Sequence, residues 1–150
     1  MRYIGHMKSR SLILILSFLV ISTTGFSQDI SDKQIAFANE FVAAVADHSE
    51  KKTMKYLDKT YKKEQLEFLK GNKEQLVNEL FGGQDLSDTD KYLNFKISEI
   101  TKIEIVEVIQ LKATTECTYI FKLMRGEQEI LSSLRLKVNG KKFGFEGARG

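Results

Sequence analysis

The residues best suited to acid–base chemistry begin with a histidine beside a carboxylate. His48 follows Asp47, and a carboxylate can orient an imidazole as a general base. The sequence ties no Ser or Cys to His48, and one histidine without a cysteine partner is not a zinc site. We therefore expect His48 to be a surface residue at a helix end.

The single cysteine is the second candidate. Cys117 shares one face of a predicted strand with Tyr119 and Phe121. A catalytic thiolate needs an exposed, electropositive setting, and an apolar strand face provides the opposite. One cysteine also forms no internal disulfide. The pattern predicts a buried, structural thiol.

An acidic segment is the third candidate. Asp85-Leu-Ser-Asp-Thr-Asp90 places three carboxylates within six residues, and calcium takes oxygen ligands of this kind. The segment lacks the turn glycine of an EF-hand, and Lys96 stands where the bidentate Glu would be. We expect a solvated loop over Gln84–Asp90.

Glu107 is the fourth candidate and the most informative. It lies on the odd-numbered face of a strand with Ile103, Ile105, Ile109 and Leu111. A carboxylate on an apolar face would have a perturbed pKa and could act as a general base or hold a ligand. The alternative is a β-bulge that switches the face, so that Val106 and Val108 turn inward and Glu107 outward.

One long helix is predicted to open the folded domain. Ser31-Asp-Lys-Gln34 is a capping-box pattern. Five apolar side chains behind it fall on one helical face. These are Ile35, Ala38, Phe41, Val42 and Val45. The spacing predicts a helix over about 32–47.

Three shorter helices are predicted to follow before residue 81. Ser49 can cap the first, and the second covers Tyr61–Lys70 and ends at Gly71. Asn72 can cap the third, which Gly82-Gly83 stops.

From Tyr92 the hydrophobic period changes to two, which predicts strands. Arg125–Gln128 has the composition of a hairpin turn, and Asn139-Gly140 is a type I′ signal. The strands are expected over Tyr92–Ile97, 101–111, 115–124, 130–138 and 143–145. Helices followed by strands predict an α+β fold, with N-terminal helices on an antiparallel sheet of about four strands.

Residues 1–27 have the pattern of a secretory signal peptide. Arg2, Lys8 and Arg10 precede an apolar run over 12–21, and small residues follow up to Ser27. The run is shorter than the roughly 20 residues of a membrane-spanning helix. We expect cleavage after Ser27, one domain over 28–150, and a location in the periplasm or outside the cell.

Removal of this leader changes the charge of the chain. The full sequence has 23 basic and 20 acidic residues, and residues 1–27 hold three of the basic ones. The remaining chain is balanced, so no basic excess is left to favour nucleic acid or an anionic membrane. We find no phosphate-binding glycine loop, nucleophile elbow or metal-spacing motif. No cofactor or metal is expected.

Four short segments carry a resemblance to a known fold family. They are Lys55-Tyr-Leu-Asp58, Tyr61-Lys-Lys-Glu-Gln65, Phe68-Leu-Lys-Gly-Asn72 and Leu80-Phe-Gly-Gly83. With the order of elements over 35–145, they resemble small exported bacterial proteins of the NTF2-like (cystatin-like) superfamily. The resemblance implies helices across a curved antiparallel sheet.

The sequence departs from this superfamily in two ways. No strand is predicted before Tyr92, and the Gln-x-Val-x-Gly loop of true cystatins is absent. Enzymes of the superfamily use an acid–base pair inside a cone, and the resemblance leaves only Glu107 and Tyr119 as candidates for it.

Three functional hypotheses follow. The first is a non-enzymatic domain that binds a small apolar ligand or a protein partner through the concave sheet face or the helix grooves. The second is a hydrolase- or isomerase-like enzyme that uses Glu107 in a cone-shaped pocket. The third is a homodimer formed through the sheet face that bears Ile120 and Met124.

Overall fold

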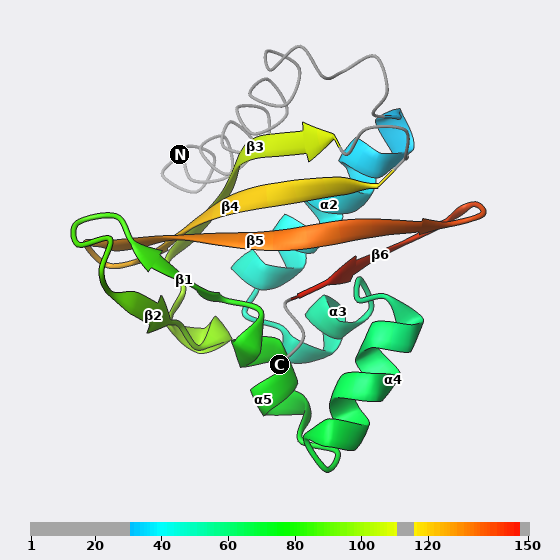
Figure 1. Ribbon diagram of the computed structural model, residues 1–150, viewed down its shortest axis with the longest axis horizontal. Helices are drawn as coiled ribbons and strands as arrows, with labels where there is room; N and C mark the ends of the chain where they lie inside the picture. The colour runs from blue at the N-terminus through cyan, green and yellow to red at the C-terminus, as the bar shows by residue number, and fades with distance from the viewer. Residues whose placement is uncertain (1–30, 111–115, 148–150) are drawn as a thin grey trace, which may run out of the picture.

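The described α-helices all precede the strands along the chain. The computed structural model describes residues 31–110 and 116–147, and the predicted leader, residues 1–27, lies outside this range (Figure 1). The helices are α2 (Asp32–Ala46), α3 (Glu50–Met54), α4 (Lys59–Phe68) and α5 (Lys73–Glu79). The strands are β1 (Gly82–Asp85), β2 (Tyr92–Asn94), β3 (Lys102–Gln110), β4 (Cys117–Arg125), β5 (Gln128–Asn139) and β6 (Lys142–Glu146), with the 3₁₀ helix η1 (Ile97–Glu99) between β2 and β3.

The strands form one antiparallel sheet, so the predicted α+β class is confirmed. The order is β2-β1-β5-β4-β3, and β6 pairs with the far end of β5. The helix α2 lies behind the sheet, α3 and α4 lie below it near β6, and α5 lies below β1 (Figure 1). The expected number of about four strands is wrong, because the described sheet has six.

The extra strand β1 begins with Gly82 and Gly83, which we predicted only as the end of a helix. A Cβ on Gly83 would lie 1.8 Å from the carbonyl oxygen of Leu131 on β5. Only glycine permits this close backbone approach. The expectation of no strand before Tyr92 is therefore wrong, since the reason for the glycine lies in a distant strand.

The segment after Tyr92 is extended for only three residues. The predicted strand over Tyr92–Ile97 ends at Asn94, and Ile97 begins η1 instead. The backbone N–H of Ile97 donates to Oδ1 of Asn78 on α5, at 2.9 Å. A side chain of α5 thus satisfies a backbone group that a longer β2 would have paired within the sheet.

The helix α2 fills the inner face of the sheet. Ser31 caps it by accepting from the N–H of Gln34, as predicted. The five apolar residues of the predicted face are all buried. The ring of Phe41 lies 5.6 Å from Phe121 and 4.8 Å from Phe145, measured between centroids. Aromatic rings therefore fill the space between helix and sheet.

The strand β3 contains the bulge that we considered as an alternative. Its pairing with β4 shifts between Ile105, opposite Phe121, and Glu107, opposite Ile120. Val108 is fully buried and Glu107 is exposed. The bulge is confirmed, and it brings Val108 into the core. The expected inward turn of Val106 is wrong, because Val106 is the residue without a partner on β4 at the bulge and is only half-buried.

Both predicted hairpin turns are present, and one is displaced. Gly126 has a positive φ in the turn between β4 and β5. Asn139 pairs with Lys142, so the second turn is made by Gly140 and Lys141. Asn139 lacks the positive φ of a type I′ turn, because it still belongs to the β5–β6 ladder.

A buried carboxylate joins the helices to the β5–β6 hairpin. Oδ1 of Asp58 accepts from the N–H of Tyr61 and caps α4, while Oδ2 accepts from the side-chain amide of Asn139. The backbone N–H of Asp58 donates to the carbonyl of Phe145. A Cβ on Gly144 would lie 2.5 Å from the Cα of Asp58, so this junction is closely packed.

We expect Asp58→Ala to lower the free energy of unfolding by about 2 kcal/mol, since it removes a helix cap and the hydrogen bond between this buried carboxylate and the Asn139 amide. Asp58→Asn should cost less, because its carbonyl oxygen can still cap α4. Ser49→Ala, which removes only the cap of α3, is the matched control at about 1 kcal/mol. Urea denaturation measures the stability of all three variants. Equal losses of stability in Asp58→Ala and Ser49→Ala would show that Asp58 acts only as a helix cap and does not stabilise the junction with the β5–β6 hairpin.

Candidate functional site

A polar groove lies between α5 and the end of β2. Its volume is about 470 Å³, within the range of ligand sites. The residues that line it are Asn72, Glu74, Gln75, Asn78, Glu79, Asn94 and Lys96. All seven side chains are amides or charged groups, so the groove suits hydrogen bonding.

The helix α5 presents these groups because it is strongly two-sided. Leu76 and Val77 point into the core and are fully buried. Helical periodicity then directs Glu74, Gln75, Asn78 and Glu79 to the opposite face.

Part of the hydrogen-bonding capacity of α5 is already used. Oδ1 of Asn72 caps the helix by accepting from the N–H of Gln75, and Nε2 of Gln75 donates to Glu79. Oδ1 of Asn78 accepts from Ile97. The amide nitrogens of Asn72 and Asn78 have no partner among the described residues and remain able to donate to a ligand.

The opposite wall is held in place by a charged cluster. Phe95 points inward and is fully buried, so its neighbours Asn94 and Lys96 face outward. The carboxylate of Glu99 accepts from the backbone N–H of Lys96 and from Arg125. Arg125 also stacks on the Phe95 ring, 4.4 Å from its centroid. The bond from Lys96 and then the Arg125 bond hold the pKa of Glu99 below its usual value.

An exposed aromatic side chain borders the groove. Tyr92 is 69 % exposed and lies two residues before Asn94 on the same face of β2. A Cβ on Gly82 would lie 2.4 Å from the Tyr92 hydroxyl, so the ring lies across this glycine. Its exposure leaves an apolar surface with a polar tip beside the groove.

The two candidates for an acid–base pair lie on opposite faces of the sheet. Glu107 is exposed on the outer face. Tyr119 is fully buried on the inner face, where its hydroxyl has no hydrogen-bond partner among the described residues. Burial, and then the nearby Cys117, raise the pKa of Tyr119. The structure does not bring these two side chains together.

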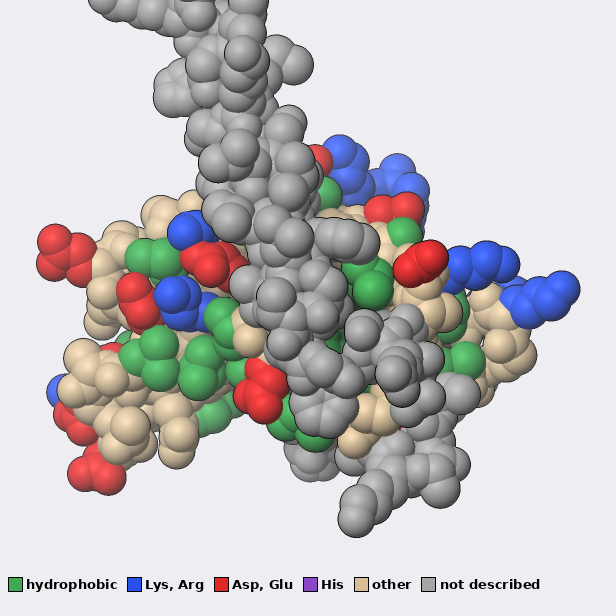
Figure 2. All heavy atoms as spheres, turned by 90° about the horizontal axis from the view of Figure 1, so that it is seen from above, with side chains coloured by type: hydrophobic (Ala, Val, Ile, Leu, Met, Phe, Trp, Pro, Cys, Tyr) green, Lys and Arg blue, Asp and Glu red, His purple; other side chains and the backbone are tan. Residues whose placement is uncertain are grey.

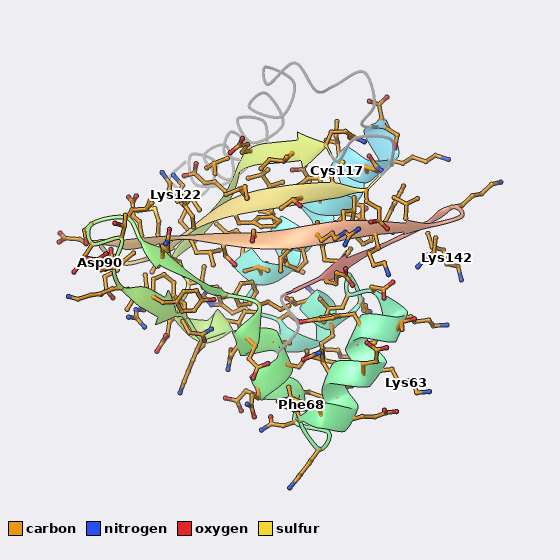
Figure 3. The ribbon with its side chains drawn as sticks, viewed as in Figure 1. Lys63, Phe68, Asp90, Cys117, Lys122 and Lys142 are labelled. Carbon is orange, nitrogen blue, oxygen red and sulfur yellow. The ribbon has the colours of Figure 1, made fainter. Side chains whose placement is uncertain are left out.

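Cys117 is buried, as predicted (Figure 3). Its Sγ donates to Oε1 of Gln110, at 3.1 Å. Burial raises the pKa of the thiol to about 11. The thiol form therefore dominates at neutral pH, which makes it a poor nucleophile.

His48 and Asp47 do not interact as a catalytic pair. Asp47 forms a salt bridge with Lys52, at 3.1 Å. His48 is exposed at the end of α2, as predicted, and its Nε2 lies 2.6 Å from the carbonyl oxygen of Ile100. The imidazole therefore donates to the backbone and fastens the helix end to the start of β3.

The acidic segment begins inside β1, so the expected solvated loop over Gln84–Asp90 is wrong for Gln84 and Asp85, which pair with β5. The rest of the segment is organised by its own turn. Asp85 is buried and accepts from both the hydroxyl and the backbone N–H of Ser87. These two bonds, the hydroxyl first, lower the pKa of Asp85. Lys91 pairs with Asp88. Within 31–110 and 116–147, no three His, Cys, Asp or Glu residues form a group that could hold a metal ion.

The outer face of the sheet mixes apolar and charged side chains. Ile120 and Met124 are half-buried there, with Lys122 between them (Figure 3). Leu131 pairs with Lys122 and is 37 % exposed. Acidic and basic side chains are also interspersed on the surface seen from above (Figure 2). A dimer through Ile120 and Met124 stays a prediction.

Sequence reasoning missed the groove. It identified Asn72 as a helix cap, but it assigned no role to Asn78, Asn94 or the Lys96 ammonium. The available signal was the run of amide and acidic side chains on the polar face of α5. That signal becomes a site only when the chain returns beside α5 after β2.

Comparison with known proteins does not assign this fold or groove to a family. No family model, curated protein or solved structure matches the chain. In the part of the chain that the structure describes, no helix has the length and apolar character needed to cross a membrane.

The buried thiol gives the first prediction for this region. We expect Cys117 to resist Ellman's reagent in the native protein at mildly alkaline pH and to react fully in guanidinium chloride. The control is Ser98→Cys in a Cys117→Ser background, because Ser98 is exposed and its new thiol should react at once. Fast labelling of native wild type would contradict a buried Cys117.

The wall of the groove gives a pH-dependence prediction. Because the pKa of Glu99 is lowered on folding, its bonds add stability above the unfolded pKa. That contribution is lost as the pH falls through the folded pKa. Glu99→Gln should therefore be less stable than wild type at neutral pH, and the difference should vanish in acid. Urea midpoints against pH test this, with the exposed Glu127→Gln as control; a constant difference would contradict it.

Proposed function

We propose that this chain is an exported, non-enzymatic domain that binds a protein partner in the groove between α5 and β2. The observation that carries the proposal is the set of unpaired amide donors in this groove, on Asn72 and Asn78. The exposed Tyr92 lies two residues before the groove residue Asn94 on the same face of β2. Aromatic rings with a polar tip are enriched where proteins bind one another.

A protein partner is favoured over a small apolar ligand. The inner face of the sheet is filled by α2 and by the rings of Phe41, Tyr119, Phe121 and Phe145. The groove is lined by polar side chains. Apolar ligands need sites lined mainly by hydrophobic side chains.

The enzymatic alternative receives less support from the geometry. Glu107 faces solvent and Tyr119 lies across the sheet from it, so the resemblance-derived pair lacks a common pocket. Membership of the NTF2-like superfamily remains a proposal, supported by helices that cover one face of an antiparallel sheet. Export remains a proposal that rests on residues 1–27.

The test compares capture of a partner by wild type and by a blocked groove. Gln75→Arg with Asn94→Arg places two bulky side chains at exposed groove positions. Thr60→Arg with Ser133→Arg adds the same charge at exposed positions elsewhere. Each exported protein is immobilised and exposed to secreted and periplasmic proteins of the producing cells, and cross-links are mapped by mass spectrometry.

We expect wild type and the control to capture the same partner in similar amounts. The amount captured by the blocked groove should be lower by about tenfold or more. Its cross-links should map to α5 and β2. Retention by the blocked groove, equal loss by the control, or cross-links confined to other surfaces would overturn the proposal.

A further inference from the structure

Three strands have one side that pairs with no other described strand, and they differ in how that side is protected. The open side of β6 is covered, because Phe145 exchanges backbone hydrogen bonds with Tyr56 and Asp58. The edge of β3 is interrupted by its bulge. Among the described residues, the edge of the three-residue strand β2 has neither a cover nor a bulge, and open edges are templates for another strand.

The backbone groups on the open edge of β2 can be named from its pairing with β1. The N–H of Asp85 donates to Lys91, and the N–H of Phe95 donates to Phe81. Leu93 lies opposite Gly83, midway between these two pairs, so its backbone groups also face β1. Because antiparallel residues alternate in direction, the N–H and C=O groups of Tyr92 and Asn94 point away from β1.

The groove lies beside this edge and supplies a second means of recognition. Asn94 belongs both to the open edge and to the groove lining. Across the groove, α5 carries the exposed carboxylates Glu74 and Glu79. Lys96 is the single cation among the lining residues, and it stands on the β2 side. The α5 wall therefore favours a positively charged side chain.

We propose that a partner segment docks here by β-strand addition. An extended stretch of the partner pairs with Tyr92 and Asn94 of β2, and a Lys or Arg side chain of that stretch faces Glu74 and Glu79. Main-chain bonds supply affinity in this mode, and side chains supply specificity. This inference rests on the proposed function and adds the conformation and charge of the bound segment.

The experiment uses three short acetylated and amidated peptides of alternating Thr and Val. The first has a central Lys, the second has Glu in its place, and the third is the Lys peptide with N-methylated backbone amides. Binding to the ¹⁵N-labelled protein is followed by chemical shifts and by amide hydrogen exchange of Tyr92 and Asn94. Glu74→Gln with Glu79→Gln tests the charge, and Glu127→Gln is the control.

We expect the Lys peptide to slow exchange at Tyr92 and Asn94. N-methylation should weaken binding about tenfold or more, because it removes the strand-pairing donors. The Glu peptide and the double Gln variant should bind several-fold more weakly. Unchanged exchange at saturating Lys peptide, equal binding of the methylated peptide, or tighter binding of the Glu peptide would overturn the inference.

The two proposals fail in different ways. If the blocked groove loses the natural partner while Tyr92 and Asn94 stay unprotected with peptide, the groove function stands and strand addition is wrong. If the blocked groove keeps the natural partner, the proposed function itself is wrong, whatever the peptides do.

Discussion

The contacts of Phe145 hold the two layers of this protein together. Its ring lies 4.8 Å from Phe41 on α2 and 5.5 Å from Tyr119 on β4. Its backbone exchanges hydrogen bonds with Tyr56 and Asp58, each at 2.8 Å. One residue thus joins the sheet, the long helix and the α3–α4 turn, so the helices have little freedom to shift against the sheet.

This tight interior is why the binding that we propose lies at the rim of the molecule. Aromatic rings pack in the core on the inner face of the sheet, whereas the end of the sheet beside α5 keeps polar groups in contact with solvent. The bond from Ile97 to Asn78 fixes the two walls of the groove against each other. The same bond uses the N–H of Ile97, which lies beyond the end of β2.

Local signals were enough to predict the helices and the long strands. Ser31, Ser49 and Asn72 cap helices where their side-chain chemistry indicated, and the two-residue period located β3, β4 and β5. The errors occur where a distant residue decides. Gly83 belongs to a strand because of the Leu131 carbonyl, and Asn139 stays in the ladder because it pairs with Lys142.

By itself, the sequence determined the α+β order, the burial of Cys117 and the set of polar residues on α5, because these follow from periodicity and side-chain chemistry along a short stretch. It left Glu107 with two alternatives. Only the tertiary structure decided that Glu107 faces solvent, since the bulge is defined by register against β4. Only the tertiary structure placed Asn94 beside α5 and left the edge of β2 open, because pairing between distant segments decides which backbone groups are used and which remain for a partner.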